Sequence, residues 1–199
     1  MPRFGSSSAR NSAFWLFTSV PKARSRRGES SVSHDFEELL ESLNARRVRY
    51  LVGGAHALAL HARPRATKDL DLFIAPTVAN SKRFILALGD FFGGAAPSYV
   101  TVDALLDPKL IIQLGVAPVR VDVLSHFATM SFSEAWRTRV DAKFGTVDAH
   151  YLGRAQLIAE KQHFDRPQDR ADVAVLLDRA RRTSTGRRRP APTKRRRLT

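Results

Sequence analysis

The net positive charge of this chain is confined to its two ends, which limits the folded part to the segment between them. The 199 residues carry a formal charge of +14. Residues 1–33 hold six basic residues and one acidic residue, and residues 181–199 hold nine basic residues and no acidic ones. The 18 basic and 18 acidic residues of 34–180 balance each other. The neutral segment has the length of one ordinary domain.

The two ends are predicted to be disordered. Residues 1–33 are rich in Ser, Arg and Gly and lack a sustained apolar period, so they cannot bury enough surface to offset the entropy of ordering. In the tail 181–199, the runs 187–189 and 194–197 are of the kind that binds phosphate backbones, although a solvated tail explains them equally well.

The composition excludes several classes of protein. The sequence has no cysteine, so disulfide scaffolds, thiolate-bound zinc, iron–sulfur clusters and thiol nucleophiles are excluded. No apolar run approaches the roughly 20 residues that a spanning helix needs. We therefore expect a cytoplasmic protein with no membrane partner, whose chemistry depends on oxygen and nitrogen groups.

Helical and strand periodicities alternate along the neutral segment. We predict a helix at 33–46, a strand at 48–52, a glycine turn and a helix at 55–60. A strand at 69–74, a helix at 78–88 and a hairpin of strands 109–114 and 119–124 follow. A short helix at 133–138, a hairpin around Gly145, and helices at 154–163 and 167–180 complete the order. Helices and strands therefore alternate along the segment, and its last part is mostly helical.

Two carboxylates share one face of the strand 69–74. Because side chains alternate across a sheet, Asp69 and Asp71 point to one side and Leu70 and Leu72 to the other. Like charges this close repel each other unless a cation lies between them, so the pair indicates a hard-metal site. The pair alone is weak evidence for a metal site, because two acids at this spacing more often lie on the solvent-exposed face of a strand.

A third acid strengthens the metal hypothesis. Asp122 lies between two core-facing valines, and it joins the pair if strands 69–74 and 119–124 are neighbours. Three carboxylates can hold two Mg²⁺ ions that activate an attacking oxygen and stabilise a leaving pyrophosphate. The Gly53–Gly54 turn before a helix would let the backbone approach a triphosphate.

These motifs together resemble the minimal nucleotidyltransferases of the DNA polymerase β superfamily, and most closely the bacterial branch related to abortive-infection toxins of type IV toxin–antitoxin systems. The resemblance rests on four ordered segments across residues 36–177, namely 51–54, 63–72, 120–124, and Lys161 with 166–173. It implies an α/β (α+β) fold, with a small mixed β-sheet flanked by helices and a C-terminal helical part.

The resemblance also implies the roles of the site residues. Asp69, Asp71 and Asp122 would be metal ligands, and Asp122 a candidate base for the acceptor hydroxyl. Gly53 and Gly54 would hold the phosphates, and Lys161 would contact the triphosphate or the leaving group. One departure is Ala55, where many members carry a hydroxyl residue.

Basic residues beside the acid pair have two interpretations. Arg65 and Lys68 would bind triphosphate oxygens, or they would serve as counter-ions to the carboxylates. On the last helix, Asp169 and Asp172 could orient Lys161, although an acid that complements the helix dipole is the simpler account of Asp169.

Two functions follow from these patterns. The first is an enzyme that uses Mg²⁺ (two ions, with Mn²⁺ as a substitute) to move a nucleoside monophosphate from an NTP to a hydroxyl of RNA, including tRNA, or of protein. A role as a toxin with an antitoxin partner is implied by the resemblance alone. The second is a catalytically silent module of the same fold that binds nucleic acid or protein. A small-molecule acceptor is a further option for the enzyme.

Overall fold

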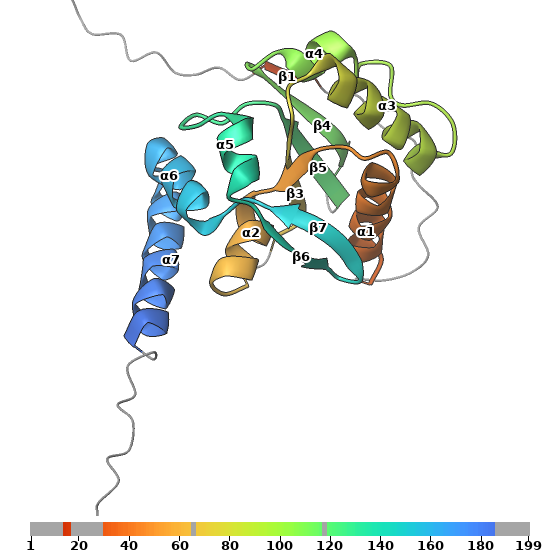
Figure 1. Ribbon diagram of the computed structural model, residues 1–199. Helices are drawn as coiled ribbons and strands as arrows, with labels where there is room; N and C mark the ends of the chain where they lie inside the picture. Colours follow the sequence, from red (N-terminus) through yellow and green to blue (C-terminus); the bar gives the residue numbers. More distant parts are fainter. Residues whose placement is uncertain (1–13, 17–29, 65–66, 117–118, 186–199) are drawn as a thin grey trace, which may run out of the picture.

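The computed structural model of the protein describes residues 14–16, 30–64, 67–116 and 119–185 (Figure 1). The described residues form seven strands and seven helices. In chain order these are β1 (Phe14–Leu16), α1 (Ser30–Ala45), β2 (Tyr50–Val52), α2 (Gly54–His61), β3 (Asp69–Ile74), α3 (Val78–Phe92), α4 (Val102–Leu106), β4 (Leu110–Val116), β5 (Val119–Leu124), α5 (Phe132–Arg137), β6 (Val140–Phe144), β7 (Val147–Tyr151), α6 (Arg154–Phe164) and α7 (Pro167–Thr185).

All seven strands belong to one mixed sheet with the order β1-β4-β5-β3-β2-β7-β6. The central strand β3 runs parallel to β5 and antiparallel to β2. The predicted hairpins, β4 with β5 and β6 with β7, are both antiparallel pairs. The predicted α+β class with a mixed sheet is therefore confirmed, and the chain order places β3 beside β5.

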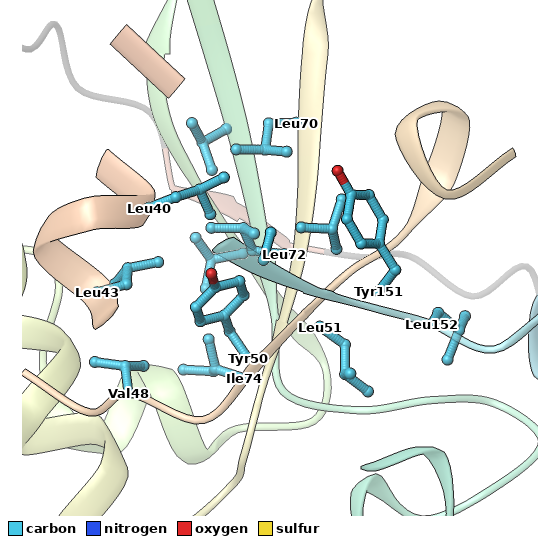
Figure 2. Close-up of a cluster of buried hydrophobic side chains, with 14 of the residues drawn as sticks. Leu40, Leu43, Val48, Tyr50, Leu51, Leu70, Leu72, Ile74, Tyr151 and Leu152 are labelled. Atoms are coloured by element: carbon cyan, nitrogen blue, oxygen red, sulfur yellow. The ribbon is translucent and has the colours of Figure 1, made fainter. Parts of the chain in front are cut away.

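One face of the sheet forms the main hydrophobic core. Leu70, Leu72 and Ile74 of β3 are fully buried, as the alternating pattern predicts. Helix α1 adds Leu40 and Leu43 to the same cluster (Figure 2). A fully buried leucine contributes roughly 1.5–3 kcal/mol relative to an exposed one. This packing fixes the direction of β3, and so it also fixes the opposite face, from which the acids project.

The C-terminal helices stand to one side of the sheet (Figure 1). Helix α6 packs against both α7 and α2. Helix α2 in turn contacts β3, the strand that carries the acid pair. This arrangement brings residues of α6 and α7 to the edge of the acidic face. No helix among the described residues is long and apolar enough to cross a membrane.

Helices and strands extend into both end segments that were predicted to be disordered. Residues 14–16, within the segment predicted to be disordered, form β1 and pair in parallel with 110–112 of β4. Three residues are too few to show a period, so the sequence pattern does not reveal this strand. Helix α1 begins at residue 30 rather than 33, and α7 continues to residue 185 rather than ending at 180. The other residues of both tails lie outside the described part.

Candidate active site

Two of the three predicted acids face each other across neighbouring strands. Asp71 of β3 is the register partner of Asp122 of β5, and Asp69 is the partner of Arg120. Because β3 and β5 are parallel and in register, Asp69, Asp71 and Asp122 all project from one face. The predicted neighbourhood of these strands is confirmed, and it places three carboxylates together.

Burial and mutual repulsion act on these carboxylates. The pKa of Asp71 is raised to about 6, first by burial and then by the negative charges of Asp122 and Asp69. Burial also raises the pKa of Asp122, although the hydrogen bond from Gln113 Nε2 to Asp122 Oδ1 (3.1 Å) and the nearby Arg120 oppose this rise. A cation close to Asp71 would relieve the cost of its negative charge.

Arg120 is the cation that the structure places among the acids. Its Nη2 donates to Asp69 Oδ2 at 2.5 Å and to Asp122 Oδ2 at 3.3 Å. Its buried Nε has no hydrogen-bond partner. Sequence reasoning assigned no role to Arg120, although it lies two residues before Asp122 and therefore on the same face of β5.

The three acids offer carboxylate oxygens, which are the ligands that hard divalent cations prefer. These oxygens lie in a partly buried region. Within the described residues, no group of three acidic or histidine side chains has the spacing of a metal site. Oxygens of Asp69 and Asp122 instead accept hydrogen bonds from Arg120. Arg120 and a metal ion would therefore compete for these oxygens.

The glycine turn is built around Asp71. The backbone N–H of Gly53 donates to the carbonyl of Asp71 at 2.9 Å. Gly54 has a φ of +51°, and a Cβ at this position would lie 1.7 Å from Asp71 Oδ2. Only glycine lets the carboxylate approach this closely. The structure thus shows that Gly54 accommodates Asp71, and a role in phosphate binding stays a prediction.

Lys161 is buried and held by two acids of α7. Its Nζ donates to Asp169 Oδ1 at 3.1 Å and to Asp172 Oδ2 at 2.7 Å, and only 9% of its side chain is exposed. The simpler account of Asp169, as an acid that only complements the helix dipole, is therefore incomplete. Burial acts to raise the pKa of Asp169, but hydrogen bonds from Arg166 and Lys161 outweigh it and lower this pKa.

A cavity of about 790 Å³ joins these parts of the site. Its wall includes the three carboxylates, Gly54, Arg120 and Lys161. Ala55 also lines it, at the position where a hydroxyl residue was expected by resemblance. The volume is in the range of small-molecule sites.

Lys68, one of the two basic residues predicted to bind the triphosphate, is not brought into this site. Lys68 is exposed immediately before β3, and it does not line the cavity. Arg65 lies outside the described residues. The cations that the structure does place at the cavity are Arg120, Lys161, Lys109 and Arg166.

Comparison with solved structures supports the fold. No family model matches the sequence, and no curated protein matches it either. The antibiotic-resistance factor ANT(2'')-Ia aligns with 14% identity and a TM-score of 0.50, over 80% of this chain and 97% of that chain. An antigenic nucleotidyltransferase-like protein from Paracoccidioides brasiliensis aligns with 12% identity and a TM-score of 0.48, over 75% of this chain and 77% of that chain. The mixed sheet and its helices agree with the predicted nucleotidyltransferase fold.

Proposed function

We propose that the protein is a Mg²⁺-dependent nucleotidyltransferase, which moves a nucleoside monophosphate from an NTP to a hydroxyl group and releases pyrophosphate. The observation that carries this proposal is the register of Asp71 with Asp122, which places three carboxylates on one face of the sheet. The same cavity contains Gly54 and Lys161. Acids, a glycine turn and a buried lysine around one cavity are a set suited to nucleotide chemistry.

Each residue of the site would have a separate role in the transfer reaction. Asp69, Asp71 and Asp122 would hold two Mg²⁺ ions, or Mn²⁺ in their place, which would supply charge neutralisation for the triphosphate and activation of the attacking oxygen. The acceptor oxygen bonds to the α-phosphorus, and the bond from that phosphorus to the bridging oxygen breaks. Asp122 accepts the hydroxyl proton, and Lys161 stabilises the negative charge of the departing pyrophosphate.

The acceptor that we propose is a hydroxyl of RNA, including tRNA, or of a protein, and we place the reaction in the cytoplasm. The basic tails 1–33 and 181–199 would attract the phosphates of an RNA acceptor. A role as a toxin, controlled by an antitoxin protein, belongs to the same proposal. Among the solved structures of similar fold is one named as an antibiotic-resistance factor, so small antibiotics that carry hydroxyl groups belong in an acceptor screen.

Two observations favour a silent binding module instead. Arg120 already neutralises two of the acids, and Ala55 lacks the hydroxyl that the resemblance leads us to expect. If the module hypothesis holds, Mg²⁺ with any NTP leaves the melting temperature unchanged. If the enzyme hypothesis holds, the two together raise it, because they bind only the folded state.

The proposal is tested by incubating the protein with Mg²⁺, each of the four α-³²P-labelled NTPs and total cellular RNA. We expect label in RNA or in a protein band with the wild type, and none with Asp69→Asn or Asp71→Asn. Asp148→Asn is the matched control, since Asp148 is an exposed acid that pairs with Lys143 on the β6–β7 hairpin. Equal labelling by wild type and Asp71→Asn would contradict the proposal.

A further inference from the structure

Phe164, the last residue of α6, is an exposed aromatic residue in the wall of the cavity that holds the carboxylates. It is 51% exposed. A single exposed apolar residue is ordinary on a protein surface. Phe164 differs because it shares its cavity with Asp71 and with Lys161, which lies three residues earlier on the same helix. Residues at this spacing are neighbours along one side of a helix.

A cation accompanies the aromatic ring. The guanidinium carbon of Arg166 lies 5.5 Å from the centre of the Phe164 ring, within the range of a cation–π contact. Arg166 Nε donates to Asp169 Oδ2 at 2.6 Å, and the other oxygen of this carboxylate accepts from Lys161. Only 4% of the Asp169 side chain is exposed. Asp169 therefore ties Arg166 to Lys161.

The turn between α6 and α7 fixes the position of Phe164. Asp165 has a φ of +48°, in the left-handed region that non-glycine residues rarely adopt. Arg170 binds both oxygens of the Asp165 carboxylate, at 2.8 and 2.9 Å. The N–H of Asp165 donates to the carbonyl of Lys161 at 3.0 Å. Asp165 is thus the left-handed C-cap of α6, and these contacts hold the turn that follows Phe164 in place.

We propose that Phe164 and Arg166 form a stacking surface for the base of the donor nucleotide. Aromatic rings and guanidinium groups both stack on nucleotide bases. Such stacking tolerates any base, because every base has a flat π-face. The inference rests on the proposed function, since it makes Lys161 the phosphate contact of the same ligand. Asp169 links the phosphate contact to the stacking surface, so the ligand that fits both carries a base and phosphates on one molecule. The larger rings of purines give them the tighter binding.

The test compares a nucleotide with its phosphate part alone. The affinities of the full chain for ATP and for inorganic tripolyphosphate are measured with Mg²⁺ present, by calorimetry. We expect Phe164→Ala to weaken ATP binding about tenfold or more and to leave tripolyphosphate binding within about twofold. Phe164→Trp restores ATP binding, because indole stacks at least as well. Leu86→Ala is the control, since Leu86 is an exposed apolar residue of α3 that does not line the cavity.

The outcomes separate this inference from the function on which it rests. If ATP and tripolyphosphate both bind the wild type, and Phe164→Ala binds ATP as tightly as the wild type does, the stacking surface is contradicted while the nucleotide site stands. If Phe164→Ala weakens RNA binding but not ATP binding, the surface serves an acceptor and the donor assignment is wrong. If neither ATP nor tripolyphosphate binds the wild type, the proposed function itself fails.

Discussion

Arg120 and Asp69 form an ion pair with a hydrogen bond of 2.5 Å inside the cavity, so a cation of the protein itself lies beside a proposed metal ligand. The same guanidinium reaches Asp122. Arg120 therefore neutralises part of the negative charge of these acids before any metal ion binds. A divalent cation must compete with Arg120 for their oxygens, which leads to the first prediction.

Replacing Arg120 by methionine should strengthen the binding of Mn²⁺ in the absence of nucleotide. The carboxylates lose their internal counter-ion, so an external cation relieves more repulsion in the variant than in the wild type. Calorimetric titration with Mn²⁺ measures the effect, and we expect at least a severalfold tighter affinity. Arg139→Met is the control, because Arg139 pairs with Asp141 on β6. Unchanged or weaker Mn²⁺ binding in Arg120→Met would show that Arg120 does not compete with metal.

Asp71→Asn should stabilise the metal-free protein at alkaline pH. Burial and the nearby acids raise the folded-state pKa of Asp71 to about 6, above its ordinary value of 3.8. The charged form therefore costs stability above pH 6, and this cost disappears below pH 4. We expect a gain of roughly 2–3 kcal/mol in the free energy of unfolding at pH 8 and no gain at pH 4.

Urea unfolding in the presence of a chelator measures this difference at both pH values. Asp148→Asn is the control, because the side chain of Asp148 is 83% exposed. A gain of the same size at pH 4 and pH 8 would mean that the charge of Asp71 is not its source.

Gly54→Ala should disrupt the acidic face more than an ordinary glycine substitution does. Its new Cβ would meet Asp71 Oδ2 at 1.7 Å, in addition to the strain of a positive φ. Gly93→Ala is a matched control, since Gly93 also has a positive φ (+69°) but has nothing within 4 Å of the added Cβ. Positive-φ strain alone costs about 1 kcal/mol.

We expect thermal unfolding to show a larger loss for Gly54→Ala than for Gly93→Ala, and Mn²⁺ binding to fall only in Gly54→Ala. Equal losses of stability with equal metal binding would show that the close approach of Asp71 to the turn has no functional consequence.

Lys161→Met should lower stability strongly, because it leaves the buried carboxylates of Asp169 and Asp172 without this cation. Removal of one member of a buried ion pair typically costs about 3–5 kcal/mol. The exposed pair of Lys143 with Asp148 is the comparison, and Lys143→Met should cost less than about 1 kcal/mol. Chemical unfolding measures both. A loss below 1 kcal/mol for Lys161→Met would show that this network does not stabilise the fold.

The sequence predicts the acidic strands better than their surroundings. The alternation in 69–74 and 119–124 yields the bounds of β3 and β5 as the structure has them, because each strand has one apolar face. Pairing in register, which brings Asp71 to Asp122, depends on tertiary contacts that no local period encodes. The ion pair of Arg120 with Asp69, which are 51 residues apart in the chain, is likewise long-range. The local pattern therefore indicated the acids, and Lys161 as a partner of Asp169 and Asp172, but not Arg120 as the counter-ion of Asp69.

The most direct test of nucleotidyl transfer compares two positions of the label. Wild type and Asp71→Asn are incubated with Mg²⁺, total RNA and the preferred NTP, labelled in parallel at the α- and the γ-phosphate. We predict that the wild type transfers the α-label to a macromolecular product and releases the γ-label in pyrophosphate, and that Asp71→Asn does neither. Transfer of the γ-label to the product, or α-labelling that persists in Asp71→Asn, would contradict a carboxylate-dependent nucleotidyltransferase.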